Sequence, residues 1–169
     1  QSVELLNQRM QEQFPNAVLP AIQLLCIDTD NDAISSLKSR SSGKTQKVTS
    51  VSAPLRTTQD YRKESSEHLT WLSRRWLFNI PRSGRVEGMR PLGRLAIVDH
   101  ATKIQTELKS CLANLVSSAS IGTTASETGL SFDVTGVDVC LVGSTSGGTS
   151  SGCLLDIAWM VRELVSNGR

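Results

Sequence analysis

The chain has 169 residues, of which 38% are hydrophobic and 4% are aromatic, and its formal net charge at pH 7 is +2. The length allows one hydrophobic core, whereas the weak charge and the few aromatic side chains argue against nucleic-acid binding, which needs a clustered basic surface. No apolar run approaches the ~20 residues of a membrane-spanning helix, and no signal peptide opens the sequence. We therefore expect a globular protein of the cytoplasm that binds neither nucleic acid nor membrane.

The first predicted elements are a helix near residues 2–14 and a strand near 21–27. Apolar residues recur at helical spacing in the first segment, and Pro15 ends it. The second segment is an almost continuous apolar run, which is typical of a parallel strand covered on both faces. Ligands of open α/β sheets bind beyond the carboxyl ends of the strands. The residues directly after this strand are therefore candidate ligand contacts, or else caps of the next helix: Asp28, Thr29 and Asp30.

Residues 35–47 are rich in Ser, Lys and Arg, and we expect a polar surface segment there. The weak alternation over 47–53, stopped by Pro54, predicts a short strand toward a sheet edge. A helix is predicted near 65–79. Its tryptophans have a spacing that indicates core packing rather than a binding platform.

The segment Gly84–Ala96 leads into a long helix that we expect from Pro91 to about Val116, because proline fits the first turn of a helix. Arg90, at the start of this helix, is placed to meet a phosphate oxygen. A solvated arginine is the alternative interpretation. The next residues, 117–136, are rich in Ser, Thr and Gly and predict a polar surface excursion or a disordered segment.

The most informative part of the sequence lies near its end. An apolar run of strand length, 137–142, is followed by a loop of glycines and hydroxyl residues and then by an apolar helix predicted over 153–165. Glycines let a backbone approach a ligand closely, and the N-terminus of a helix attracts anions. This order of elements is typical of a phosphate site. Alternating strands and helices predict a parallel sheet with right-handed crossovers.

Two other motifs partly match the same loop. A Walker A loop needs a lysine at the position of Thr149. A nucleophile elbow needs its serine directly after the strand and its histidine later in the chain, whereas His68 and His100 both precede Ser150. An ordinary strand-to-helix connection is the remaining alternative, although such connections are usually shorter.

The four cysteines indicate reduced thiols. Cys26 and Cys140 fall in predicted core strands, and Cys111 and Cys153 fall in predicted helices. None belongs to a C-x-x-C pair or lies near a histidine, so we expect no disulfide and no direct metal site. Cys153 starts a predicted helix, where the pKa of a thiol can fall, but a small core residue is the favoured interpretation.

Three segments carry a family resemblance. Residues 146–152 resemble the phosphate-loop signature of tubulins and their bacterial cell-division homologues, with Ser150 where the signature has glycine. If that position requires a positive φ, serine is strained there. Asp28-Thr29-Asp30 resembles the Asn-Thr-Asp that follows the second strand, with Asp28 in place of asparagine. Gly84–Ala96 resembles the loop near the terminal phosphate, most closely that of bacterial tubulin-like proteins.

The resemblance implies an α/β fold: a parallel, doubly wound, Rossmann-like sheet of the tubulin GTPase type. In that family a first strand precedes the elements found here, and further elements follow them. We therefore interpret residues 1–169 as a partial nucleotide-binding domain, an excerpt of a longer protein. The missing strand would leave the strand at 21–27 without a partner on the side that faces 137–142.

The resemblance also implies binding of GTP or GDP together with Mg²⁺, and head-to-tail assembly into an oligomer or filament in which hydrolysis is completed. No catalytic base is assigned. The alternative is an assembly protein with degenerate nucleotide binding, and a hydrolase that uses Ser150 would need a histidine outside this sequence. Asp28, Thr29 and Asp30 would lie near the sugar or a magnesium-bound water. The phosphates would contact the following residues: Gly88, Arg90, Ser146, Gly147, Gly148, Thr149, Ser150, Ser151 and Gly152.

Overall fold

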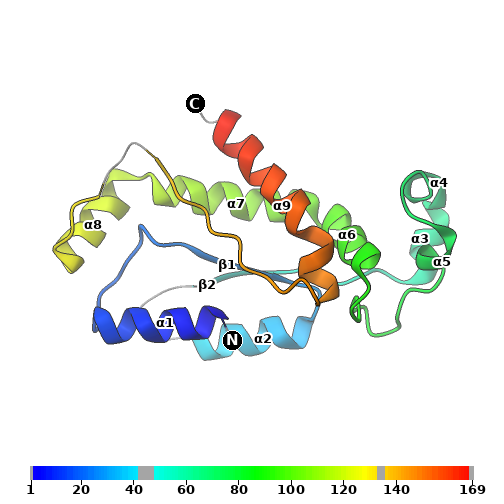
Figure 1. Cartoon of the computed structure of the whole chain (residues 1–169), viewed down its shortest axis with the longest axis horizontal. Coiled ribbons are helices and arrows are strands. Elements are labelled where there is room, and N and C mark those ends of the chain that lie inside the picture. The colour runs from blue at the N-terminus through cyan, green and yellow to red at the C-terminus, as the bar shows by residue number, and fades with distance from the viewer. Residues whose placement is uncertain (1, 42–47, 133–135, 168–169) are drawn as a thin grey trace.

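The computed structural model describes residues 2–41, 48–132 and 136–167. It has a mixed α/β architecture, rich in helices, around a short parallel sheet of β1 (Leu24–Asp28) and β2 (Val48–Ser52), with Leu24 opposite Val48 and Asp28 opposite Ser52. Helix α2 (Asn31–Ser41) connects the two strands, as a parallel pair requires. Helices α1 (Ser2–Gln13) and α2 lie on one side of the sheet, and α7 (Ala101–Leu115) lies on the other (Figure 1). The predicted helix at 2–14 and the parallel strands are thus confirmed.

The edge of β1 opposite β2 is open. Within the described ranges, β2 is the strand hydrogen-bonded to β1, and every residue of β1 is only half-buried. The strand predicted at 137–142 was wrong, since these residues run as an irregular segment, and Val142 is 79% exposed. Strand geometry needs a neighbour that pairs with its N–H and C=O groups, and among the described residues this segment pairs with no strand. Cys140, predicted in the core, is exposed for the same reason.

The helix predicted at 65–79 is instead two short helices, α4 (Ser65–His68) and α5 (Arg74–Leu77), and a third, α3 (Thr58–Lys63), precedes them. They fold around Tyr61, whose side chain is fully buried. The prediction of core packing holds for Trp76, which packs against the core cluster of Leu72 and Leu77, but it is wrong for Trp71, which is 38% exposed. The apolar side chains of this segment therefore reach the core from several short helices, and not from one face of a single helix.

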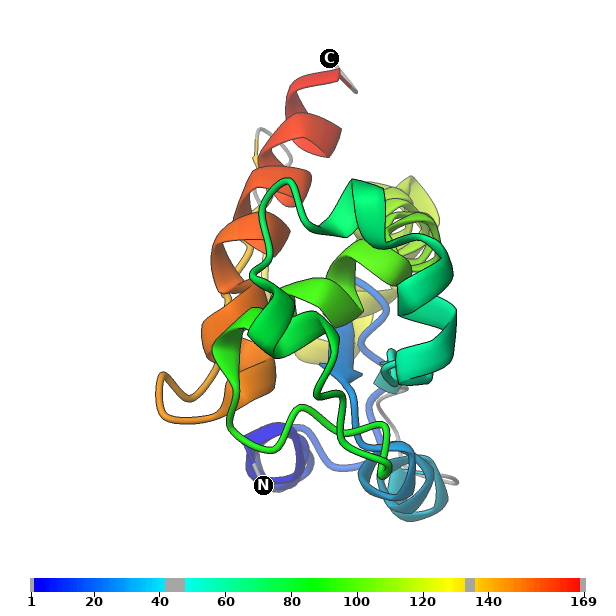
Figure 2. The ribbon, with the colours of Figure 1, turned by 90° about the vertical axis from the view of Figure 1, so that its right-hand side faces the viewer.

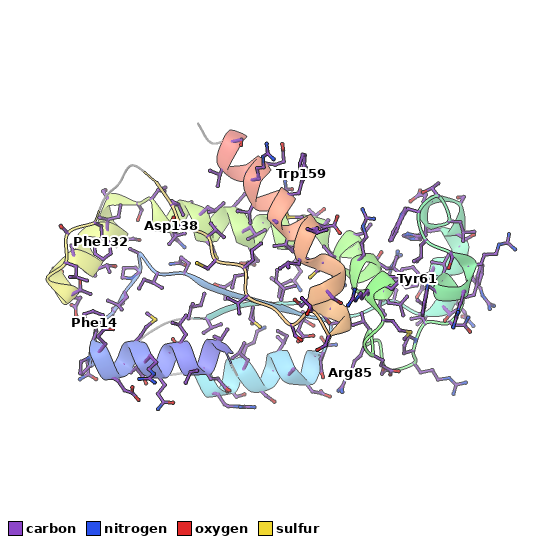
Figure 3. The ribbon with its side chains drawn as sticks, in the orientation of Figure 1. Phe14, Tyr61, Arg85, Phe132, Asp138 and Trp159 are labelled. Atoms are coloured by element: carbon purple, nitrogen blue, oxygen red, sulfur yellow. The ribbon has the colours of Figure 1, made fainter. Side chains whose placement is uncertain are left out.

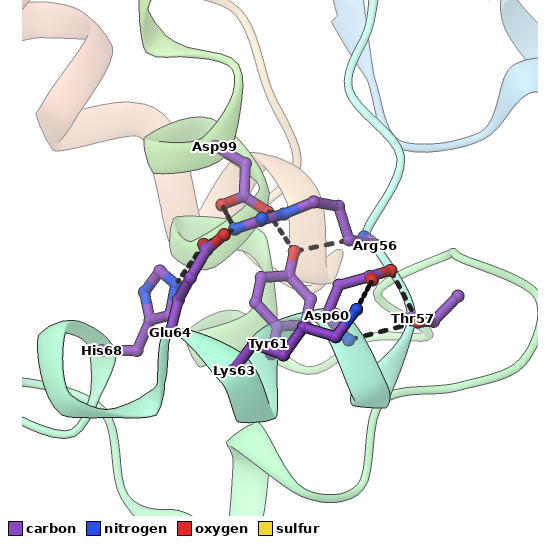
Figure 4. A network of polar contacts seen from close by, with 8 residues as sticks. All are labelled: Arg56, Thr57, Asp60, Tyr61, Lys63, Glu64, His68 and Asp99. Atoms are coloured by element: carbon purple, nitrogen blue, oxygen red, sulfur yellow. Dashed lines mark hydrogen bonds and ion pairs between the residues drawn. The ribbon is translucent and has the colours of Figure 1, made fainter.

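The helix predicted from Pro91 to Val116 is divided at His100 into α6 (Arg90–Asp99) and α7. Side chains at the joint bind the connection that follows β2. The carboxylate of Asp99 accepts hydrogen bonds from the Arg56 guanidinium, at 2.9 Å from Nη2, and from the Tyr61 hydroxyl (Figure 4). The His100 ring is hydrogen-bonded to the carbonyl of Pro54 at 2.9 Å. Hydrogen bonds to Glu64 and Asp99 raise the pKa of Arg56, which keeps its charge at this joint.

The two polar segments divide differently from their prediction. The first residues of 35–47 belong to α2, and 42–47 lie outside the described residues. Most of 117–136 is not an irregular excursion, because Ser118–Thr128 forms α8. Ser117 caps this helix by accepting from the N–H of Ser120, and Gly129 ends it with φ of +69°. Thr124 is fully buried, and its hydroxyl accepts from the N–H of Ala21 at 2.9 Å, which anchors α8 to the segment before β1.

Helix α9 (Gly148–Asn167) begins earlier than the predicted start at residue 153, so part of the predicted phosphate loop is helical. Its first turns pack on α6 through glycines. A Cβ on Gly152 would lie 2.9 Å from the backbone N of Arg94, and one on Gly93 would lie 3.0 Å from the backbone C of Gly148. Only glycine allows this approach of two backbones, and the resulting contact favours helical geometry at 148–152. Buried residues extend the contact, since Ile97 of α6 belongs to one hydrophobic cluster with three residues of α9: Cys153, Ile157 and Val161.

The glycine contact predicts opposite effects of two alanine substitutions. Gly152→Ala should destabilise the protein by about 1–3 kcal/mol, because backbone atoms of α6 surround the new methyl group and cannot give way cheaply. Gly122→Ala in α8 should stabilise the protein by up to about 1 kcal/mol, because alanine favours the helix and nothing lies within 4 Å of the new methyl. Urea unfolding of the full-length protein measures both changes. A Gly152→Ala protein as stable as the wild type would contradict the close contact.

Candidate functional site

Helices α2, α6 and α9 begin at the same end of the molecule (Figures 1 and 2). The hydroxyl of Thr29, at the end of β1, lies 3.0 Å from the hydroxyl of Thr149 in the first turn of α9. A Cβ on Gly148 would lie 2.7 Å from the backbone N of Met89, the residue before α6. Each helix carries partial positive charge at its N-terminus. Their convergence favours an anion at this end of the sheet.

The first turn of α9 retains free donors. Its first main-chain bond is from Ser151 N–H to the carbonyl of Gly147, at 3.2 Å. The N–H groups of Gly148, Thr149 and Ser150 have no acceptor among the described residues. The N-terminus of a helix with such donors is a common binding site for phosphate.

Serine at position 150 is not strained. Positive φ values occur elsewhere in the described chain, at Glu87 and Gly88 for example, but at no residue of 146–152. Ser150 is helical, and its hydroxyl lies against Gly143, where a Cβ would collide with it. The departure from the signature therefore costs no backbone strain.

The hydroxyl of Thr149 binds the end of β1. Besides its contact with Thr29, which is 3% exposed, it lies 3.4 Å from Oδ1 of Asp28. Asp28 Oδ1 also accepts from the N–H of Asp30, at 3.2 Å. Thr149 thus joins α9 to the turn after β1, so a ligand would have to compete for its hydroxyl.

Asp30 caps the helix that follows it. Its Oδ1 accepts from the N–H groups of Asp32, at 2.9 Å, and Ala33, at 3.2 Å. This is the capping role that the sequence left open, and it satisfies two of the unpaired donors of α2. The other oxygen, Oδ2, is 3.2 Å from the guanidinium of Arg85.

The loop before α6 brings Gly88 and Arg90 to the same place. Glu87 and Gly88 have φ of +47° and +80°, so two consecutive left-handed residues turn the chain into the helix. The Arg90 guanidinium donates to the carbonyl of Thr145 at 3.0 Å and holds the loop that precedes α9. The side chain of Arg90 is otherwise exposed.

The structure brings the three predicted segments, 28–30, 88–90 and 146–152, to one end of the sheet. Arg85, which has no role predicted from the sequence, pairs with Asp30 and with Asp32. The sequence signal that could have identified Arg85 is its position between Gly84 and Gly88, within the segment that resembles the loop near the terminal phosphate. No group of three or more His, Cys, Asp or Glu residues that could hold a metal occurs in the described ranges.

Cys153 and both histidines pack against other parts of the described chain. Burial raises the pKa of the Cys153 thiol, and the nearby carboxylate of Asp156 raises it further, so the favoured interpretation as a small core residue is confirmed. His68 packs edge-on against Tyr61, and His100 binds Pro54. In the described part of the chain neither histidine contacts Ser150.

Comparison with protein families matches residues 3–169 to a family described as tubulin like. Searches of curated proteins and of solved structures gave no match. No helix in the described ranges has both the length and the apolar character needed to cross a membrane.

The contacts of Thr149 predict a loss of stability when its hydroxyl is removed. Thr149→Val should destabilise the ligand-free protein by about 0.5–1.5 kcal/mol, because Thr29 loses its partner. The sequence predicts this hydroxyl as a phosphate contact, whereas in the structure it already has a protein partner. Thr106→Val, on the exposed face of α7, is the matched control and should change stability by less than about 0.5 kcal/mol. Equal thermal melting of both variants and the wild type would contradict the bond between β1 and α9.

Proposed function

Because the chain belongs to the tubulin-like family, we propose that the end of the sheet where α2, α6 and α9 begin binds the phosphates of a guanine nucleotide. The observation that carries this proposal is that the N-termini of three helices lie together. One of them, the start of α9, has free N–H groups at Gly148, Thr149 and Ser150. The choice of guanine rests on family membership alone.

The proposed contacts follow from the positions of the three segments. Residues 146–152 would surround the phosphates, chiefly through backbone N–H groups, with the hydroxyls of Ser146 and Ser150 beside them. Arg90 and the turn at Gly88 would approach the terminal phosphate. Gly148 and Gly152 would act indirectly, because their lack of a side chain allows the approach of α9 to residues 88–94.

The turn after β1 would lie beside the sugar or a magnesium-bound water. Asp28 uses Oδ1 within the protein, whereas Oδ2 has no hydrogen-bond partner among the described residues. Mg²⁺ would be held by phosphate oxygens and water, and it would neutralise part of the phosphate charge. Hydrolysis would then depend on charge stabilisation and a positioned water supplied in the assembled protein.

A second candidate is a tubulin-like assembly protein in which nucleotide binding is degenerate. The observation in its favour is that several polar groups proposed for the ligand already have protein partners. Thr149 binds Thr29, and Asp30 both caps α2 and binds Arg85.

The proposal predicts heat of binding when the full-length protein is titrated with GTP. Arg90→Gln should weaken the affinity about tenfold or more, because a charge-assisted contact to a phosphate is lost. Arg9→Gln, on an exposed position of α1, is the control and should bind as the wild type does. ATP is titrated in parallel to test base selectivity. Folded protein that gives no heat with either nucleotide would favour the assembly protein without nucleotide binding.

The head-to-tail assembly implied by the family predicts a concentration-dependent GTPase. If one subunit completes the site of the next, phosphate release per subunit should rise with protein concentration, and nucleotide should increase light scattering. Both signals are recorded over one concentration series. Constant specific activity without scattering would contradict assembly-coupled hydrolysis and leave the nucleotide site itself intact.

A further inference from the structure

Arg85 lies at the edge of the proposed phosphate site, beside the start of α2 (Figure 3). Its guanidinium spans two carboxylates of one turn. Nη2 is 2.6 Å from Oδ2 of Asp32, and Nη1 is 3.2 Å from Oδ2 of Asp30. One arginine of the loop before α6 thus pairs with both acids that flank the N-terminus of α2.

The loop that carries Arg85 is fixed on both sides. The next residue, Val86, is buried, and the carbonyl of Gly84 accepts from the N–H of Leu55 at 2.8 Å. The Met89 N–H bonds to the carbonyl of Val86 at 2.8 Å and closes the left-handed turn that leads to Arg90. Arg85 is therefore positioned by the same turn that places Gly88 and Arg90 against the start of α9.

The charges at this edge explain why a cation is needed. The junction of β1 and α2 carries the carboxylates of Asp28, Asp30 and Asp32, on the side of the molecule where a polyanion is proposed to bind. Like charges repel, and partial burial strengthens the repulsion relative to bulk water. Arg85 neutralises two of the three acids through its ion pairs with Asp30 and Asp32.

We propose that Arg85 is a positioning residue of the phosphate site, which lowers the repulsion between the acidic turn and the bound phosphates. This inference rests on the proposed nucleotide binding. It assigns to Arg85 an electrostatic action through Asp30 and Asp32 rather than a contact with the ligand. Asp32 is 86% exposed and has no other side-chain partner in the described ranges. Its negative charge is therefore compensated by Arg85 alone among the described side chains.

The test measures dissociation of a fluorescent methylanthraniloyl derivative of GDP from the full-length protein, chased with excess GDP in a stopped-flow instrument. Arg85→Gln should raise the dissociation rate about fivefold, the change that corresponds to one partly exposed ion pair. Arg85→Lys should dissociate at a rate close to that of the wild type, because lysine keeps the positive charge. Arg82→Gln is the matched control, because Arg82 lies in the same loop and has no ion-pair partner among the described residues, and it should leave the rate unchanged.

A double variant separates charge compensation from a purely structural role. Arg85→Gln combined with Asp32→Asn should return the dissociation rate close to that of the wild type, because the uncompensated charge is gone. If Arg85 only held the loop in place, the double variant would dissociate as fast as Arg85→Gln. The difference between Arg85→Gln and the wild type should also fade at about 1 M salt, where the Debye length is near 3 Å.

The outcomes distinguish this inference from the proposed function. Wild-type protein that does not bind the fluorescent nucleotide would overturn both. Wild-type binding with an unchanged rate for Arg85→Gln, or with no rescue in the double variant, would overturn the role of Arg85 and leave nucleotide binding in place.

Discussion

The site depends on one packing contact, the approach of α9 to α6 without side chains between them. Gly93, Gly148 and Gly152 remove the Cβ atoms that would keep the two backbones apart. The approach places the first turn of α9 against the turn at Gly88, and it makes residues 148–152 helical. In most glycine-rich phosphate loops the glycines are explained by positive φ or by ligand contact. Here two glycines of the signature serve helix packing.

A second constraint is the incomplete sheet. β1 has a partner on one edge, and its other edge faces a groove of about 420 Å³ that is lined mainly by apolar residues of α1, β1 and the 138–142 segment. The residues of β1 are half-buried and the apolar residues of 137–142 are exposed for the same reason. No strand lies between the two segments in the described structure. A parallel strand that reads as fully apolar is normally covered on both faces and paired on both edges.

The sequence was sufficient where the signal is local. Apolar spacing identified α1, β1 and β2, and the position of Asp30 directly before a helix allowed its capping role to be foreseen. The three short segments at 28–30, 84–96 and 146–152 were sufficient to identify the family, which the match over residues 3–169 confirms. The three site segments come together because each precedes the N-terminus of a helix at one end of the sheet.

The remaining features arise from contacts distant in sequence. The break at His100 depends on Pro54 and Arg56, and no propensity at residues 99–101 indicates it. The early start of α9 depends on Gly93, which lies in another helix, since glycine by itself disfavours helix. Residues 137–142 have the pattern of a strand but no strand partner in the part of the chain that the structure describes. Arg85 was missed because its partner Asp32 lies 53 positions away in the sequence.

The central claim is that the free N–H groups at the start of α9 bind phosphate. Hydrogen–deuterium exchange of the full-length protein with and without GDP measures this directly, because unpaired amides exchange fast and become protected when they donate to an anion. GDP should slow exchange at Gly148, Thr149 and Ser150 while the amides of α8 stay unchanged. Binding of GDP with no added protection at these three amides would contradict phosphate binding at the start of α9.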